Sequence, residues 1–543
     1  MAEPTIARDD ATSKPFAKKV TRRALIGGLA AGTAVISAPG VAAAAAQVGR
    51  PGRGPDQRRG RGDGDGPDGG PEQFSRIFRN HPPFREADDE LRVMLAELGR
   101  PGGILDAKDA LEEGPARLIT EPELSLNNPN NPDHTAGTTF MGQFFDHDIT
   151  SDAGSTLGRR TSLRRSTNLR SARFDLDSVY GGGPNLNPAL YETGDRFRFR
   201  VESGGLFEDL PRDSAGAAII GDPRNDENMM ISGIQVAFLL FHNAVLERVR
   251  ASGTAGDEAF AQARQLVIWH YQWLILHQFL PQFVGQEMVN NILANGRRHY
   301  TPVRAQIPVE FQTSAYRFGH SMVRPSYRAN LAGDDGEPFF GMVFDPAEFG
   351  KSDPDDLAGG SRAPRRFIGW QTFFDFEDGE VKPNKRIDTH MSSPMFQLPL
   401  GAIGTTRGEP IGPLSLPIRN LLRHITWGIP SGQDVAETMG APLLSAADLS
   451  DITDIAPALT DATPLWLYVL READLMADGR HLGPVGGRIV AEVFIGLLEM
   501  DPMSILNSSP NWRPSLPSRG GSGDFGMVDL LTIAGVDPAA RGQ

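Results

Sequence analysis

The stretch TTFMGQFFDHDIT, residues 138–150, holds the densest set of chemically useful side chains in the sequence. Read as a helix, it places Gln143 and His147 one turn apart on one face with Asp146 beside them, because residues three and four apart are neighbours on a helix surface. Asp148 falls about 100° further round and faces away from them. A histidine in this setting can take a proton from a small molecule and return it, and a carboxylate facing the other way suits a hard cation. Taken alone, DHD is more typical of a cluster of solvated polar residues at a helix end.

A second polar cluster reads GDPRNDEN and directly precedes a long apolar segment, residues 228–250. Arg224 and Glu227 are three residues apart and would share a face in a first helical turn. Asn225 or Asp226 could instead cap the helix that follows, which is the structural interpretation of this cluster.

Two further clusters pair polar groups at a spacing of three residues. In YRFGH, Arg317 and His320 share a helical face, and Gly319 lets a bulky group approach the backbone. In LPIRNLLR, the pair is Asn420 and Arg423. A single histidine in an amphipathic helix is more often a hydrogen-bonded core residue than a ligand, so no cluster is decisive alone.

The composition excludes several classes of protein. The 543 residues contain no cysteine, which rules out disulfides, zinc–thiolate sites and thiolate-ligated haem. A formal net charge of −14 disfavours nucleic acid and anionic membrane as partners. With 39% apolar residues the chain can bury a sizeable core.

The N-terminal region is predicted to lie outside the fold. Arg22 and Arg23 precede a weakly apolar run rich in alanine and glycine, so residues 1–46 are predicted to be a twin-arginine export signal; a retained anchor is the alternative. Residues 47–72 are dominated by Gly, Pro, Arg and Asp and are predicted to be a disordered linker. Export through the twin-arginine machinery would place the protein in an extracellular, periplasmic or cell-surface location.

The remainder is predicted to be one large, mainly α-helical domain over residues 73–543, with long loops, little β-structure and no stable membrane span. Helical periodicity or length predicts helices at 228–250, 266–280, 309–323 and 487–500. Pro281 and Pro325 are expected to end the second and third of these. Long loops are expected at 125–134 and 345–365, which are rich in Asn, Asp, Pro and Gly.

Taken together and in this order, the four clusters resemble the animal-type haem peroxidases of the peroxidase–cyclooxygenase superfamily, and specifically a bacterial exported branch. GQFFDHD is similar to that family's distal-histidine motif, DPRNDEN to its catalytic-arginine segment, YRFGH to its proximal-histidine motif, and the pair in LPIRNLLR to the segment that supports the proximal side. The resemblance covers roughly residues 75–535.

The resemblance implies that the chain binds haem b. His320 would be the proximal iron ligand, oriented by Asn420. His147 would be the distal base, Arg224 would stand beside it, and Gln143 would hold the distal water or a halide.

The resemblance also implies how the haem is held. Arg317 and Arg423 would pair with the haem propionates. Asp146 and Glu227 occupy the positions of carboxylates that form ester bonds to haem methyl groups, which makes one or two such links plausible. The third link found in some family members needs a methionine where this chain has Asn228, so that link is not expected.

Calcium is implied as a second cofactor. Asp148 matches the family's first ligand, and the loop ending in Val-Tyr-Gly supplies the others: Ser171 through its hydroxyl and carbonyl, Arg173 through its carbonyl, and the carboxylates of Asp175 and Asp177. Oxygen donors with three carboxylates suit Ca²⁺. A structural role beside the distal helix is expected.

The implied function is a haem peroxidase, in which hydrogen peroxide forms an oxoferryl intermediate that oxidises small organic donors, halides or both. One alternative is a fatty-acid dioxygenase of the cyclooxygenase type. That chemistry uses a tyrosine three residues before the proximal histidine, where this chain has Arg317, and Tyr316 lies on another face. The other alternative is a non-catalytic exported haem or adhesion protein. After Arg423 the chain departs from the family pattern by reading His424-Ile-Thr-Trp-Gly, which leaves the packing of the proximal side open.

Overall fold

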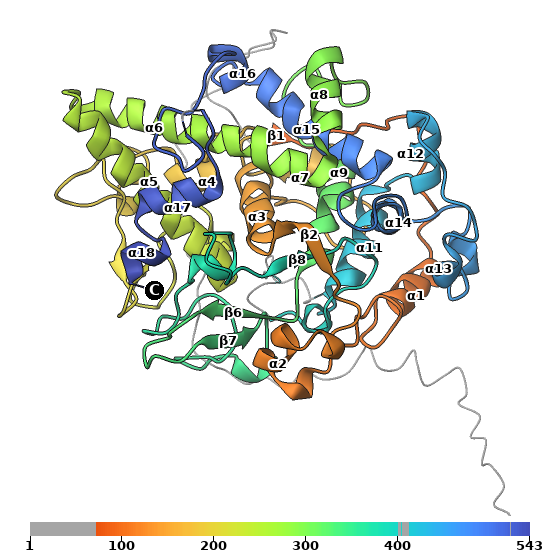
Figure 1. Ribbon diagram of the computed structural model, residues 1–543. Helices are drawn as coiled ribbons and strands as arrows, with labels where there is room; N and C mark the ends of the chain where they lie inside the picture. The colour runs from red at the N-terminus through yellow and green to blue at the C-terminus, as the bar shows by residue number, and fades with distance from the viewer. Residues whose placement is uncertain (1–71, 400–402, 404–411, 522, 543) are drawn as a thin grey trace, which may run out of the picture. The chain divides into compact units, whose positions relative to one another are not determined.

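The computed structural model describes residues 72–399, 403, 412–521 and 523–542 (Figure 1). The predicted export signal and all of the predicted linker except Glu72 lie outside the described residues. The described residues all fall within the compact unit Asp68–Gln543.

Helices dominate the described part of the chain, as the sequence predicts. The α-helices are α1 (Asp89–Leu98), α2 (Pro115–Thr120), α3 (Gly137–Ile149), α4 (Asp177–Tyr180), α5 (Met229–Ala251), α6 (Gly256–Leu274), α7 (Leu280–Val284), α8 (Gln286–Asn295), α9 (Val309–Thr313), α11 (Leu416–Trp427), α12 (Gly432–Met439), α13 (Ser450–Thr453), α14 (Leu465–Ala477), α15 (Pro484–Met500), α16 (Ile505–Ser508), α17 (Met527–Ala534) and α18 (Pro538–Arg541).

Short 3₁₀ helices join many of these elements, and the strands are few. The 3₁₀ helices are η2 (Leu111–Glu113), η3 (Pro122–Leu124), η4 (Leu163–Arg165), η5 (Pro188–Leu190), η6 (Pro223–Asp226), η8 (Ala315–Met322), η9 (Pro346–Glu348), η10 (Trp370–Thr372), η11 (Ser393–Phe396) and η12 (Pro457–Leu459), and η7 (Ile275–Phe279) is a π-helix. The strands are β1 (Glu72–Gln73), β2 (Asn130–Thr135), β3 (Thr167–Asn168), β4 (Glu202–Ser203), β5 (Glu208–Asp209), β6 (Ser326–Asn330), β7 (Phe339–Met342) and β8 (Pro383–Lys385). In the described residues they pair as two-stranded sheets: β1 with β3, β2 with β8, β4 with β5, and β6 with β7. The prediction of a mainly α fold with little β-structure is confirmed.

Helix α3 lies in the core, where it packs against α5, and α5 in turn packs along α6 and α17 (Figure 1). Phe144 of α3 stacks on Phe238 of α5, with ring centroids 4.6 Å apart. A Cβ at Gly142 would lie 3.1 Å from the Phe279 ring, so a larger residue there would require the ring to shift by a few tenths of an ångström. Helix α5 is long and apolar enough to cross a membrane, but 83% of its most apolar window is buried inside the protein, as in a core helix.

Three details of the helix and loop predictions are wrong. The segment 309–323 is not one α-helix: α9 ends at Thr313, and the chain then turns into η8. The turn falls at Ser314, whose hydroxyl lies 3.1 Å from His424 Nε2; serine side chains that bond elsewhere compete with helix continuation.

Pro281 does not end the second predicted helix. The π-helix η7 carries the chain from α6 into α7, where Pro281 lies in the first turn and its missing N–H is not needed. The predicted loop at 125–134 contains strand β2, whereas the loop at 345–365 is confirmed apart from η9.

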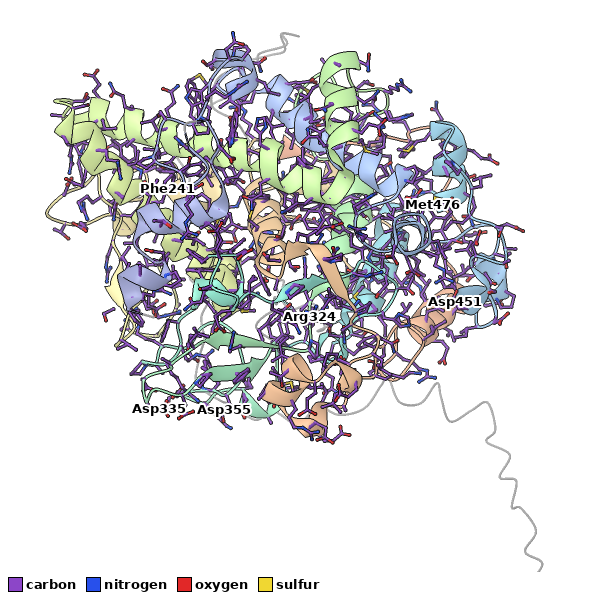
Figure 2. All side chains as sticks on the ribbon, in the orientation of Figure 1. Phe241, Arg324, Asp335, Asp355, Asp451 and Met476 are labelled. Atoms are coloured by element: carbon purple, nitrogen blue, oxygen red, sulfur yellow. The ribbon has the colours of Figure 1, made fainter. Side chains whose placement is uncertain are left out.

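Buried polar side chains join the segments around the core. Arg324, which lies amid the packed side chains in Figure 2 while Asp335 and Asp355 lie at the rim, is only 4% exposed. Its guanidinium donates to the carbonyls of Asn128 and Asn384 at 3.1 and 3.0 Å, which fixes β8 beside the end of η8. Thr139 of α3 donates to Asn384 Oδ1 at 2.9 Å, so α3 is tied to the same strand.

Candidate functional site

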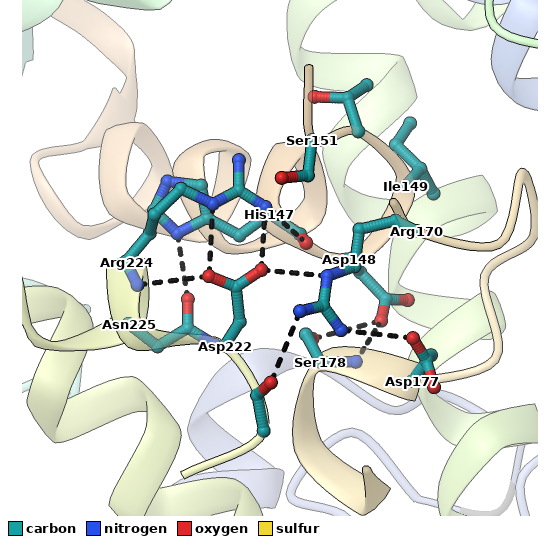
Figure 3. Close-up of polar contacts among 12 residues, drawn as sticks. His147, Asp148, Ile149, Ser151, Arg170, Asp177, Ser178, Asp222, Arg224 and Asn225 are labelled. Carbon is teal, nitrogen blue, oxygen red and sulfur yellow. Dashed lines mark hydrogen bonds and ion pairs between the residues drawn. The ribbon is translucent and has the colours of Figure 1, made fainter. Parts of the chain in front are cut away.

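Helix α3 presents its polar side chains to two different neighbours, as its spacing predicts. His147 is 5% exposed and faces the turn before α5, whereas Asp148 is fully buried and faces the loop before α4 (Figure 3). Asp148 accepts hydrogen bonds from the Ser178 N–H and hydroxyl at 3.2 and 3.0 Å and from the Leu176 N–H at 3.0 Å. The two sides of α3 can therefore serve different functions.

The ring of His147 is held by a chain of two amides. Its Nδ1 lies 2.8 Å from Asn225 Oδ1, and Asn225 Nδ2 donates to Gln235 Oε1 of α5, also at 2.8 Å. Burial, and then the positive charge of Arg224, lower the pKa of His147 to about 4. The imidazole is therefore neutral at pH 7 and can accept a proton.

Arg224 stands beside His147 and is held by Asp222. Its Nε and one terminal nitrogen donate to the two Asp222 oxygens at 3.0 and 2.7 Å, and the same terminal nitrogen donates to the His147 carbonyl at 3.0 Å. Arg170 forms a second ion pair with Asp222 at 2.9 Å and donates to Asp177 at 3.0 Å (Figure 3). A row of charges of alternating sign thus runs from Arg224 through Asp222 and Arg170 to Asp177, the first residue of α4.

Gln143 lies between the two residues that end the GDPRNDEN cluster. Its Nε2 donates to Glu227 Oε2 and its Oε1 accepts from Asn228 Nδ2, both at 3.2 Å. Burial raises the pKa of Glu227 to about 7, against the opposing effect of Arg224. Asp146, whose carboxylate accepts from Thr150 at 3.3 Å, is within electrostatic range of Glu227. The two predicted ester-forming carboxylates are therefore brought to one region.

On the proximal side, His320 lies in η8, which packs against α3. The Tyr316 hydroxyl of η8 donates to the Gly142 carbonyl of α3 at 3.0 Å, and this bond joins the two walls of the site. The side-chain nitrogen Nδ2 of Asn420, in α11, lies 3.0 Å from His320 Nδ1. In a 3₁₀ helix, residues three apart are aligned, so Arg317 and His320 still share a face although η8 is not an α-helix.

Positive charge gathers beside His320. Burial, and then the neighbouring Arg423, lower the pKa of Arg317 to about 9. Among the described residues neither guanidinium hydrogen-bonds a carboxylate: Arg317 donates through Nε to the Gln312 carbonyl at 3.0 Å, and Arg423 lies 3.9 Å from Asp152. Arg419 adds a third like charge. This cluster suits an anionic group, such as a pair of carboxylates.

The proximal residues fit a haem group on three counts. Asn420 Oδ1 is buried and has no hydrogen-bond partner; with the amide turned, it would accept from His320 Nδ1–H and leave the Nε2 lone pair for a metal. Burial, followed by Arg317 and Arg423, lowers the pKa of His320 to about 3, so the ring is neutral as a ligand must be. A Cβ at Gly319 would meet no atom within 4 Å, so space is open at the backbone next to His320.

The predicted calcium ligands are brought together only in part. Burial raises the pKa of Asp148 to about 8 and that of Asp175 to about 6, and the Asp175 charge contributes to the shift at Asp148. Ser171 donates to Asp175 at 2.9 Å, and Arg173 is exposed, as a residue that offers only its carbonyl can be. The Asp177 carboxylate is turned to Arg170 instead. Within the described ranges no group of three or more His, Asp or Glu side chains is arranged to hold a metal, so the calcium site stays a prediction.

Sequence reasoning missed several residues that position this site. Asn225 was interpreted only as a helix cap, but Asn228 caps α5 through a 3.0 Å bond from Ile231 N–H, and Asn225 binds His147. Asp222 was not singled out, although its position two residues before Arg224 is a usable signal. Gln235 is seven residues beyond Asn228 and therefore on the same face of α5, which is a weaker signal.

Comparisons with known proteins point to one family. A family model described as animal haem peroxidase matches residues 152–357, a range that includes Arg224 and His320 but begins after His147. Chorion peroxidase of Drosophila melanogaster is 26% identical over 355 residues, covering 59% of this chain and 40% of that protein. Peroxidase mlt-7 of Caenorhabditis elegans is 31% identical over 198 residues, covering 34% of this chain and 27% of that protein. The chain therefore spans less than half the length of these curated relatives.

Two solved structures have folds similar to that of this chain. Peroxidase A from Dictyostelium discoideum aligns with a TM-score of 0.57 and 16% identity, covering 85% of this chain and 93% of that one. A fatty acid alpha-dioxygenase from Arabidopsis thaliana aligns with a TM-score of 0.52 and 14% identity, covering 81% and 74%. At these identities the likeness establishes the fold and does not distinguish peroxidase from dioxygenase chemistry.

Proposed function

We propose that this chain is a member of the animal haem peroxidase family, whose model matches residues 152–357, and that it binds haem b and uses hydrogen peroxide to oxidise small electron donors. The observation that carries the proposal is the pairing of His147 with Arg224, while His320 lies on η8, the segment that Tyr316 ties to α3, with Asn420 of α11 beside it.

Four side chains would hold the cofactor. His320 would bind the iron through Nε2 while Asn420 accepts from Nδ1–H, and Arg317 and Arg423 would pair with the propionates. Haem, when bound, would supply an iron centre that takes up peroxide and stores its oxidising equivalents. The neutral imidazole supports these assignments, as do the two guanidiniums, which hydrogen-bond no carboxylate among the described residues.

The distal residues would carry out the proton transfer. His147 Nε2 would accept a proton from one oxygen of hydrogen peroxide and return it to the other, which would leave as water; the two electrons that cleavage of the O–O bond requires would come from the haem. The Arg224 guanidinium, held by Asp222, stabilises the negative charge that develops on the leaving oxygen. Base catalysis of this kind contributes roughly 10²- to 10⁴-fold to a rate.

The dioxygenase alternative is weakened by the residues around His320. Arg317 occupies the position at which that chemistry needs a tyrosine, and it lies in the arginine cluster. The Tyr316 hydroxyl is bonded to the Gly142 carbonyl and is turned toward α3. We therefore propose peroxidase chemistry, with small organic molecules or halides as donors and Gln143 as the residue that holds the distal water or halide.

The finer features of the cofactors are also proposals. Asp146 and Glu227 are the candidates for one or two ester links to haem, which mass spectrometry of the denatured protein would reveal as retained haem. Asp148, Ser171, Arg173, Asp175 and Asp177 are the candidate calcium ligands, which metal analysis after dialysis against a chelator would test. Export by the twin-arginine pathway is tested by replacing Arg22 and Arg23 with lysine and locating the protein.

The decisive experiment for the proposed function is stopped-flow absorption of the haem-loaded protein mixed with hydrogen peroxide. The Soret band should change rapidly in the wild type, and His147→Ala should slow that change by about 10²- to 10⁴-fold while leaving haem binding intact. A Soret band that ignores peroxide would favour the non-catalytic haem protein, and the absence of any Soret band would refute haem binding itself.

A further inference from the structure

Resting on the function proposed above, we propose that Asn225 is a positioning residue that fixes the tautomer of His147, with Nδ1 protonated and the Nε2 lone pair directed at the peroxide site. Asn225 would not touch the substrate; it would act through the histidine. The cluster that we propose supplies Arg224 would then also orient His147.

The contact is short, buried and held from three directions. Asn225 is fully buried and its Oδ1 lies 2.8 Å from His147 Nδ1 (Figure 3). Its Nδ2 donates to Gln235 at 2.8 Å, and its own N–H donates to the Asp222 carbonyl at 3.0 Å. Gln235 is 1% exposed, so water does not compete freely for either amide. No other hydrogen bond to the His147 ring is found among the described residues.

This contact selects between the two neutral forms of the ring. A neutral imidazole carries one N–H, and the nitrogen that lacks it is the acceptor. A carbonyl oxygen at Nδ1 requires the proton there, which leaves Nε2 free to accept a proton. In the reversed arrangement, the Asn225 amide nitrogen would donate to Nδ1, and the ring proton would lie on Nε2. Nε2 could then not accept a proton from the peroxide. The amide oxygen and nitrogen of an asparagine are assigned from the groups around them. Substitution of Asn225 can therefore distinguish the two arrangements.

The turn 222–225 would then position both distal side chains by separate bonds. Asp222 holds the Arg224 guanidinium, whereas Asn225 holds the His147 ring. Loss of one bond should therefore impair one function: proton transfer for Asn225 and charge stabilisation for Asp222.

The test compares two ligands of the haem-loaded protein. Hydrogen cyanide must give up its proton to bind ferric haem, so its association rate reports the Nε2 lone pair. Carbon monoxide binds ferrous haem without moving a proton and reports only access to the pocket. Neither measurement requires turnover of peroxide, so failure of this proposal and failure of the proposed function are distinguishable.

Three variants give the contrast. Asn225→Leu removes the acceptor and should slow cyanide association about tenfold, which is the worth of one buried hydrogen bond, while carbon monoxide association stays within about twofold. Asn225→Asp keeps an acceptor oxygen and should restore cyanide association to within about threefold of the wild type. Asn243→Ala is the matched control, because Asn243 is a buried asparagine of α5 whose side chain, within the described part of the chain, hydrogen-bonds only the Phe199 backbone, at 2.8 and 2.9 Å.

Three results would overturn the proposal. Unchanged cyanide association in Asn225→Leu would show that the bond does not set the tautomer. Equal slowing in Asn225→Leu and Asn225→Asp would show that Nδ1 needs a donor, as in the reversed arrangement. Equal slowing of cyanide and carbon monoxide would show a general change of the pocket. If Asn225→Leu does not fold, the Asn225→Asp rate decides: a rate near that of the wild type supports the proposal, and a tenfold slower rate refutes it.

Discussion

Replacing Asp222 by asparagine should weaken both the fold and the reaction with peroxide. The Asp222 carboxylate is 2% exposed and binds two guanidiniums, with Arg224 at 2.7 and 3.0 Å and Arg170 at 2.9 Å. Burial alone would raise its pKa, but Arg224 and then Arg170 hold the pKa well below its usual range. The carboxylate is therefore charged at any pH at which the protein would be studied.

The expected loss of stability depends on how far the two arginine partners of Asp222 are buried. Breaking a buried ion pair by removing one partner costs about 3–5 kcal/mol. The Arg224 and Arg170 side chains keep 26% and 15% of their surface exposed and can recover some hydration, and the amide can still accept one bond. We therefore expect a loss of roughly 2–4 kcal/mol in the free energy of unfolding. With its anchor lost, Arg224 should also stabilise the leaving oxygen less well, which slows the peroxide reaction by up to about 10²-fold.

Urea denaturation and stopped-flow absorption with peroxide would measure the two effects. The control is Asp353→Asn, because Asp353 also binds an arginine, Arg365 at 3.0 Å, but is 43% exposed. An exposed pair is worth at most about 1 kcal/mol, so this variant should match the wild type closely in both assays. The reasoning is refuted if the two variants lose equal stability, or if Asp222→Asn reacts with peroxide at the rate of the wild type.

Three further predictions concern other parts of the site and the core. Asn420→Leu should lower haem affinity about 10- to 100-fold, because it removes the partner of His320 Nδ1; a haem titration of the apoprotein measures this, and an unchanged dissociation constant would contradict the proximal assignment. Tyr316→Phe should cost about 1 kcal/mol of stability through the lost bond to Gly142 and leave the peroxide reaction intact, whereas loss of all oxidation activity would favour a tyrosyl-radical dioxygenase. Burial raises the pKa of Glu472 from 4.5 to about 7, so its contribution to stability is present below pH 4.5 and is lost as the pH rises through 7, by roughly 3 kcal/mol. Glu472→Gln should remove this part of the pH dependence of the free energy of unfolding measured in urea. If the free energy of unfolding of the variant changes with pH as in the wild type, this carboxyl is not the cause.

The sequence predicts those parts of the fold that depend on local pattern. The helix 228–250 has an apolar stretch and a capping asparagine, and it is found as α5 within one residue at each end. The break at Ser314 and the continuation through Pro281 depend on a contact with His424 and on a π-helical turn, neither of which leaves a periodic signal. At these two positions tertiary contacts, and not local propensity, determine the backbone conformation.

The candidate site divides in the same way. Spacing on α3 predicts that His147 and Asp148 face apart, because helical geometry alone sets it. Which partners they meet is decided by segments far along the chain, so the bonds from His147 to Asn225 and from Asp148 to Ser178 could not be read from spacing. The role of His424 was left open by the departure from the family pattern. In the structure it accepts from the Trp466 N–H at 3.1 Å and so joins α11 to α14.

The bond between Tyr316 and Gly142 has a consequence for redesign of this protein. Its acceptor is a main-chain carbonyl, so this tie between η8 and α3 depends on a phenol and on backbone, and not on any side chain of α3. Side chains of α3 other than His147 and Gln143 can therefore be exchanged without breaking this tie. Selection for altered substrate preference could begin there, with Tyr316 and Gly142 kept invariant so that η8 stays held against α3.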